Sequence, residues 1–280
     1  MKGYYHIYTK GLSDDVIFRD RTDYVAGMNY VPVSLLGLDV VVLAFTLMSN
    51  HVHFVVYGTR KDVVCFIETY KNLLGRYARR QYGVDSLLRR LPVGVSLIGD
   101  SPDDLKRIIA YVLNNPVAAG INCFPLQYEW GSGRYYFCAT QNTSDVPLIS
   151  IPRRRQIRMI RSCKPLCQNL LMNAEGYISP RSYIDVAYVE RLFYRASSLS
   201  YFLSSSAKRP ASLILSDGLL TEIVREILDK QYGGLVPDRL PAESRKHLVA
   251  DLNRRLKSSP KQIARILNIP LPEVVSILKR

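Results

Sequence analysis

Two strongly apolar stretches, residues 38–47 and 51–57, are separated by a short Met-Ser-Asn segment. Ser and Asn suit a tight reversal of the chain, so the two stretches predict an antiparallel β-hairpin. Side chains alternate between the two faces of a strand, so His51 and His53 project to one side and Phe54 projects to the other. The sequence therefore predicts two imidazoles on one face of a sheet, backed by an apolar core.

Such a pair can hold a metal ion, although two histidines in a strand are more often a structural pair. A metal bound by two imidazoles usually takes an oxygen ligand as well. Tyr111 and Asn115 are four residues apart, so on a helix they share one face and offer a nucleophilic hydroxyl and an amide oxygen. The alternative is that Tyr111 is buried and that Asn115 only caps the end of its helix. In either case we expect the helix to end at Pro116.

The segments around the hairpin set the fold class. Residues 4–9 read as a strand and residues 20–30 as a helix before the hairpin, and residues 62–82 show apolar side chains at helical spacing after it. A further helix begins near residue 101, where a serine cap and a proline precede two acidic residues. This order predicts an α+β fold, an antiparallel sheet with helices on one face.

The second half of the chain is less regular until its end. We expect a domain over residues 1–140, a basic connector with partial structure over 141–210, and a helical domain over 211–280. Two short helices, 261–268 and 272–279, meet through a turn and resemble a helix-turn-helix. They either read DNA bases or serve only for packing and phosphate contact.

The charge of the chain points to a partner. The net charge is +14 and the pI is near 9.6, and 23 of the 38 basic residues follow residue 140. Such an excess favours a polyanion, most often nucleic acid, over simple solubility charge. The basic side chains that could contact phosphates, or merely form solvated helix faces, are Lys71, Arg76, Arg79, Arg80, Arg153, Arg154 and Arg155.

Cysteine usage and the apolar segments bear on localisation. The five cysteines are odd in number and form no Cys-x-x-Cys pair, so they predict reduced thiols. The N-terminal residues have no apolar core of the signal-peptide type, and Pro32, Gly37 and Asp39 interrupt the apolar run of residues 31–48. We expect a cytoplasmic protein with no membrane partner.

Two phrases of the sequence together resemble a known family. The phrases LMSNHVHFVV and YVLNNPVAAGI, with YYHIYTKG, IFRDRTDY and YEWGSGRYYF around them, are similar to the REP-associated tyrosine transposases. These are single-strand DNA transposases of the HUH endonuclease superfamily, and the resemblance spans roughly residues 1–140. It implies a ferredoxin-like sheet with His51, His53 and Asn115 as metal ligands and Tyr111 as the nucleophile.

The resemblance also implies an activity. The chain would be a metal-dependent single-stranded DNA endonuclease and strand transferase that acts on hairpin DNA through a 5′-phosphotyrosine intermediate, as a monomer or homodimer. The cofactor would be Mg²⁺ or Mn²⁺, of which Mn²⁺ suits imidazole better. Two alternatives stay open: a catalytically inert DNA-binding regulator that uses the C-terminal helices, and an RNA-binding or RNA-processing protein.

Overall fold

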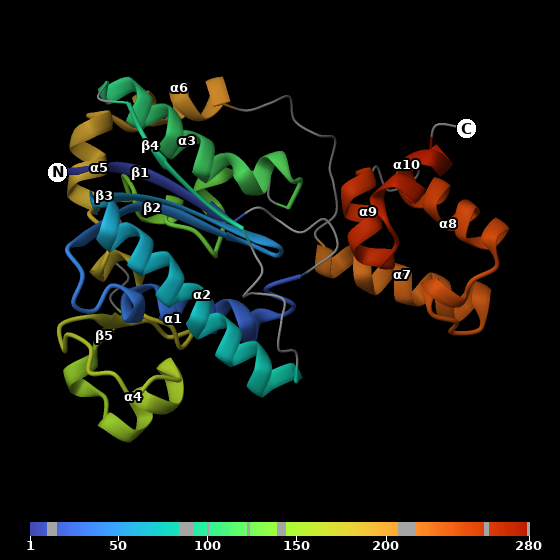
Figure 1. Cartoon of the computed structure of the whole chain (residues 1–280), viewed down its shortest axis with the longest axis horizontal. Coiled ribbons are helices and arrows are strands. Elements are labelled where there is room, and N and C mark those ends of the chain that lie inside the picture. The colour runs from blue at the N-terminus through green and yellow to red at the C-terminus, as the bar shows by residue number, and fades with distance from the viewer. Residues whose placement is uncertain are drawn as a thin grey trace.

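The structure is a computed structural model (Figure 1). Its buried apolar side chains form two separate hydrophobic cores. It describes residues 1–9, 16–83, 92–99, 101–121, 124–138, 144–206, 217–254 and 258–278. The first core surrounds a four-stranded sheet formed by β1 (Lys2–Thr9), β2 (Val40–Met48), β3 (His51–Thr59) and β4 (Val93–Leu97). The strand order is β2-β3-β1-β4 and every neighbouring pair is antiparallel.

The predicted hairpin is confirmed. Strands β2 and β3 pair from Val40 opposite Gly58 to Met48 opposite His51, and a two-residue turn joins them. Two helices, α1 (Arg21–Ser34) and α2 (Arg60–Tyr82), complete the order β1-α1-β2-β3-α2-β4, which is the ferredoxin-like arrangement. The α+β class and the antiparallel sheet are therefore as predicted.

Helices α1 and α2 cover one face of the sheet (Figure 1). The ring of Phe54 on β3 meets Phe66 and Tyr70 of α2 edge-on, with ring centroids 5.2 and 5.4 Å apart. Each helix begins at a capping side chain, because Asp20 accepts a hydrogen bond from the N–H of Asp23 and Thr59 caps α2 in the same way. Burial of these large rings against β3 fixes the sheet face on which α2 lies.

Helix α3 (Pro102–Ala118) departs from the expectation of helices on one face, because it lies over the opposite face of the sheet (Figure 1). The hydroxyl of Thr46 on β2 donates to the carbonyl of Val112 at 2.9 Å. On its other side, the Asn114 amide donates to the carbonyl of Leu203 at 2.6 Å. Hydrogen bonds therefore tie α3 both to the sheet and to a later helix.

The expectation that Pro116 ends this helix is wrong. Proline has no N–H to donate to the carbonyl four residues earlier, here that of Val112. That carbonyl instead accepts from the Thr46 hydroxyl, so the missing intrahelical bond leaves no unsatisfied acceptor. The helix continues to Ala118, and Asn115 keeps helical geometry.

The described residues of the predicted connector pack on the first core. Asn29 of α1 donates to the carbonyls of Met159 and Gly176 at 3.2 and 3.3 Å and accepts from the N–H of Ile178 at 2.8 Å. Buried Leu148, Ile160, Ile178, Val189 and Leu199 join the same core. The secondary structure of this part comprises β5 (Val146–Pro147), β6 (Leu171–Met172), α4 (Arg153–Ile160), α5 (Val186–Phe193) and α6 (Ala196–Ser206). A domain boundary at residue 140 stays a prediction.

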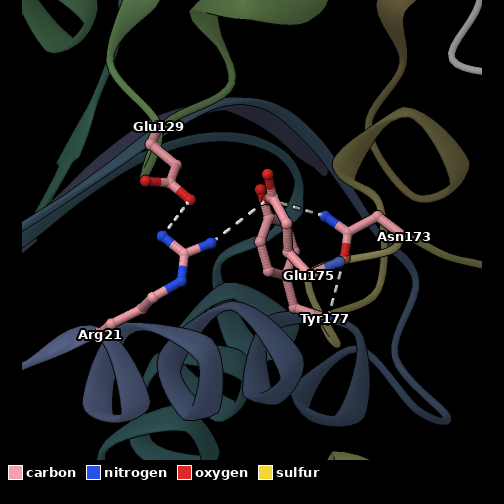
Figure 2. Close-up of polar contacts among 5 residues, drawn as sticks. All are labelled: Arg21, Glu129, Asn173, Glu175 and Tyr177. Atoms are coloured by element: carbon pink, nitrogen blue, oxygen red, sulfur yellow. Dashed lines mark hydrogen bonds and ion pairs between the residues drawn. The ribbon is translucent and has the colours of Figure 1, made fainter.

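A cluster of polar side chains joins three segments of this unit (Figure 2). Arg21, in the first turn of α1, forms ion pairs with Glu129 at 2.7 Å and with Glu175 at 3.6 Å. Asn173 accepts hydrogen bonds from the backbone N–H groups of Glu175 and Tyr177. Because the Arg21 side chain is half exposed, we assign these ion pairs to orienting the segments rather than to strong stabilisation.

The second core belongs to a helical unit at the C-terminal end, as predicted. Its helices are α7 (Asp217–Tyr232), α8 (Ala242–Arg254), α9 (Pro260–Leu267) and α10 (Leu271–Leu278). Ser259 caps α9, and Asn268 turns the chain toward α10 with a positive φ of 54°. A role of α9 and α10 as a helix-turn-helix stays a prediction.

Short 3₁₀ turns complete the secondary structure. They are η1 (Pro125–Gln127), η2 (Gly133–Tyr135), η3 (Leu148–Ser150), η4 (Pro180–Ser182) and η5 (Pro237–Arg239). Among the helices in the described ranges, none combines the length and apolar character needed to cross a bilayer.

Candidate active site

Three imidazoles meet on the face of the sheet that α3 covers. His51 and His53 lie on β3, and the antiparallel pairing of β1 with β3 brings His6 beside them. The Nε2 atom of His6 lies 3.1 Å from the Nδ1 atom of His53, and the two rings stack with centroids 5.3 Å apart. The ring of His51 meets that of His53 edge-on at 4.9 Å. The predicted pair is therefore a cluster of three.

The orientation of His51 is set by its neighbour in the turn. Its Nδ1 atom lies 2.8 Å from the Oδ1 atom of Asn50. An amide oxygen can only accept a hydrogen bond, so Nδ1 of His51 carries the proton. The Nε2 atom of His51 is then unprotonated in the neutral ring and can donate its lone pair to a cation.

Helix α3 brings Asn115 to the two β3 histidines. The amide nitrogen of Asn115 donates to the carbonyl of Tyr111 at 2.9 Å and approaches that of Val112 at 3.5 Å. The side chain also lies within hydrogen-bonding reach of both His51 and His53. Because its nitrogen is used within the helix, its oxygen is the atom left to face the imidazoles.

Tyr111 is an exposed tyrosine on this face. Its ring lies edge-on to His53 and His6, with centroids 5.7 and 5.8 Å apart, and it is 45% exposed. In contrast, Tyr70 and Tyr77 of α2 are buried. An exposed phenol beside imidazoles can reach a large substrate, whereas a buried one cannot. The structure thus brings together all four residues that the sequence proposed for catalysis and metal binding.

Burial controls the protonation of the histidines. It lowers the pKa of His6 and of His51 to about 4. Burial, followed by the positive charges that His51 and His6 would carry, lowers the pKa of His53 to about 2. All three rings are therefore neutral near pH 7, which is the form that binds metal ions.

These residues fit a divalent cation with nitrogen and amide oxygen ligands. Two neutral imidazoles and an amide oxygen face one another, and the Nδ1 atom of each imidazole is already engaged. Within the part of the chain that the structure describes, no group of three or more His, Cys, Asp or Glu side chains is arranged to hold a metal ion. A metal site here would therefore need the Asn115 oxygen and groups supplied by substrate or water.

The predicted phosphate-contacting residues fall into different environments. Lys71 is buried and pairs with Glu68 at 3.3 Å, so it does not join an exposed basic surface. Arg153 donates to the carbonyl of Cys163 and to Gln156, which gives it a structural role in the fold. The remaining predicted residues have exposed side chains: Arg76, Arg79, Arg80, Arg154 and Arg155.

Sequence reasoning missed two side chains at the site. His6 and Tyr8 are two residues apart on β1, so both side chains lie on the face that carries His53. Their spacing is visible in the sequence, but it indicates a place at the site only when the pairing of β1 with β3 is known. The Tyr8 ring lies over Gly94 of β4, where an added Cβ would come within 2.2 Å of the ring. A glycine at this position is therefore what allows Tyr8 to lie along the site.

Comparison with known proteins gives one structural likeness. No family model matches the chain, and no curated protein matches it. A solved structure of a REP-associated tyrosine transposase bound to a REP hairpin is similar over 46% of this chain and 75% of that chain, with 13% sequence identity and a TM-score of 0.36.

Proposed function

We propose that this protein is a metal-dependent single-stranded DNA endonuclease and strand transferase that acts on hairpin DNA through a covalent 5′-phosphotyrosine intermediate. The observation that carries the proposal is the meeting of Tyr111 and Asn115, from α3, with His51 and His53, from β3, on one face of the sheet. These residues lie some sixty positions apart in the chain and belong to the two phrases that resemble tyrosine transposases. A pure binding module has no need of this combination.

His51, His53 and Asn115 are the residues that would hold the cation. A bound Mg²⁺ or Mn²⁺ offsets the negative charge that builds up on the phosphate during attack. His6 would accept a hydrogen bond from Nδ1–H of His53, which leaves Nε2 of His53 for the cation. Asn50 does the same for His51.

Tyr111 supplies the nucleophile. Its hydroxyl oxygen forms a bond to the scissile phosphorus, and the bond from phosphorus to the 3′-oxygen breaks. The phenolic proton leaves the tyrosine, and the departing 3′-oxygen takes up a proton to become a hydroxyl. The 5′-phosphate stays on Tyr111 as a diester, so a 3′-hydroxyl can attack it and restore a DNA strand. This reversibility makes strand transfer possible.

The adduct itself gives the test. A labelled DNA hairpin with an unpaired flank, incubated with Mn²⁺, should become covalently attached to the protein and survive denaturing electrophoresis. Tyr111→Phe should abolish the adduct but keep hairpin binding, whereas Tyr201→Phe, at an exposed tyrosine of α6, is the matched control and should form it. An adduct on the Tyr111→Phe protein would refute the assignment of the nucleophile.

Metal dependence and the alternatives are tested in the same system. His51→Ala should abolish the adduct and also the binding of Mn²⁺ measured by electron paramagnetic resonance. Tight hairpin binding with no adduct in Mn²⁺ would favour the inert regulator. Attachment or tighter binding of a matched RNA hairpin would favour the RNA-processing alternative.

A further inference from the structure

A basic cavity of about 560 Å³ lies between α2 and α4. Helix α2 contributes Arg76 and Arg80, and the C-terminal half of α4 with the residues after it contributes Arg158, Arg161 and Lys164. No acidic side chain is among the residues that line it. Five positive charges therefore face one cavity without a carboxylate to balance them.

The cations of this cavity are not engaged with carboxylates elsewhere. Within the described residues, none of the five forms an ion pair. Arg76 donates from Nε to the carbonyl of Asn72, and the guanidinium of Arg161 lies over the ring of Tyr77 at 4.9 Å. Both contacts leave the positive charge uncompensated. Like charges held this close favour a polyanionic ligand that neutralises several of them.

The walls of the cavity are fixed by buried contacts. The amide of Gln156 donates to the carbonyls of Leu148 and Ile151 at 2.7 and 2.8 Å, which holds α4 in place. Asn29 anchors the end of α4 to α1 through the carbonyl of Met159. A site built on anchored helices loses little conformational entropy when a ligand binds.

The cavity is separate from the active site. It lies on α2, which packs on the Phe54 side of β3, whereas His53 and Tyr111 lie on the opposite side of the sheet. A small substrate could not touch both places. A nucleic acid strand could, because its phosphates repeat along an extended polymer.

The chemistry of the lining favours phosphates over bases. Tyr30 and Tyr77 are buried, and Arg161 covers the ring of Tyr77. No exposed aromatic face is therefore offered for stacking, which is how unpaired bases are usually held. Long exposed arginines and a lysine instead suit the backbone of a duplex, in which the bases are already stacked.

We propose that the cavity between α2 and α4 is a second DNA site, which binds backbone phosphates of the duplex stem while the unpaired scissile strand occupies the Tyr111 face. This inference rests on the proposed function for the identity of its ligand. Arg158 and Lys164 are its most informative members, because the structure gives their side chains no other polar contact among the described residues; the Lys164 contact with Ser162 is made by the backbone N–H.

Salt dependence of binding tests the site directly. The measurement uses the full chain with Tyr111→Phe, a DNA hairpin with a long stem, and no metal, so that no cleavage occurs. For a duplex contact, the slope of log K against log salt concentration should become less steep by about 1.8 when Arg158→Ala and Lys164→Ala are combined. Arg60→Ala, at an exposed position in the first turn of α2 and outside the cavity, is the matched control and should keep the slope.

Two results would overturn the inference. An unchanged slope in the double variant would show that the cavity contacts no phosphate. A change of about 1.4 with an unpaired strand of the same length, which is the value for the loss of two single-strand contacts, would show that the ligand is not specifically the duplex stem. Cys163 provides an independent readout, because this exposed thiol lines the cavity and should react more slowly with an alkylating agent when the hairpin is bound, whereas exposed Cys65 should not.

The same measurements separate this inference from the proposed function. If the slope changes but no adduct forms in Mn²⁺, the cavity binds duplex DNA and the nuclease proposal fails. If the adduct forms but the slope is unchanged, the nuclease proposal stands and the second site fails.

Discussion

The Nε2 atom of His6 lies 3.1 Å from the Nδ1 atom of His53, across two neighbouring antiparallel strands. Through this contact, His6 of β1 supports His53, which is a proposed metal ligand. Hydrogen bonds of this kind fix the tautomer and the ring orientation of a ligating histidine. We therefore expect His6 to act as a positioning residue and not as a ligand.

Replacement of His6 should weaken metal binding without removing it. Because the partner of His53 would be lost, His6→Ala should reduce Mn²⁺ affinity by about 10- to 100-fold. Mn²⁺ titration followed by electron paramagnetic resonance measures this change. His6→Asn, which keeps a hydrogen-bonding side chain, should recover part of the affinity, and His247→Ala, at an exposed residue of α8, should have no effect. Full affinity in His6→Ala would show that the contact does not support the site.

The oxygen of Asn115 is the next testable feature. Asn115→Leu keeps a side chain of similar size but has no oxygen ligand, so Mn²⁺ affinity should fall about tenfold or more. Asn115→Asp places a carboxylate beside His51 and His53 and should strengthen binding, since an anionic oxygen is a better ligand for Mn²⁺. Equal affinity in the wild-type and Leu proteins would exclude Asn115 as a ligand.

The hydrogen bond from Thr46 to the carbonyl of Val112 should contribute to stability. Thr46→Val removes the donor and leaves a buried carbonyl with only the long contact to Asn115, which should cost about 1–3 kcal/mol of the free energy of unfolding. Urea denaturation measures the loss. Thr46→Ser restores a hydroxyl and should recover most of the stability, and a Thr46→Val protein as stable as wild type would contradict the role we assign to this bond.

The partly buried His51 should make the metal-free protein less stable in mild acid. An unfolded histidine has a pKa of about 6.5, while burial lowers that of His51 to about 4. As the pH falls through this window, the unfolded state takes up protons first, so the free energy of unfolding decreases. Near pH 5 the loss for His51 is on the order of 2 kcal/mol. Urea denaturation near pH 7 and near pH 5 should show a smaller difference for His51→Gln than for wild type.

The sequence predicted most of the sheet and the four residues that the fold brings together on the His53 face, and its failures have physical causes. Alternation and helical spacing depend on local patterns, and these placed the hairpin and α2 correctly. The participation of His6 depends on the pairing of strands far apart in the chain, which no local pattern reveals. The continuation of α3 through Pro116 likewise depends on Thr46, a donor 66 positions from the carbonyl it satisfies.

The basic residues show the same difference between what a local sequence pattern predicts and what packing between distant segments decides. Arg153 lies in a run of arginines that predicts phosphate contact, but the fold uses it to bind the carbonyl of Cys163. Arg158 and Arg161, later in the same run, are the ones that face α2 across the cavity. Which arginines of a run remain available depends on how the helix packs, and a list of charges along the chain does not contain that information.

The two-sided attachment of α3 has a consequence for how the reaction is organised. Thr46 binds the helix from the sheet and Leu203 binds it through Asn114, so the helix that carries Tyr111 is anchored on two sides. If Tyr111 is the nucleophile, as we propose, its helix does not swing toward the target. In the proposed reaction, the scissile phosphate would be carried to the tyrosine, and the accuracy of cutting would depend on the contacts that align the strand rather than on the group that breaks it.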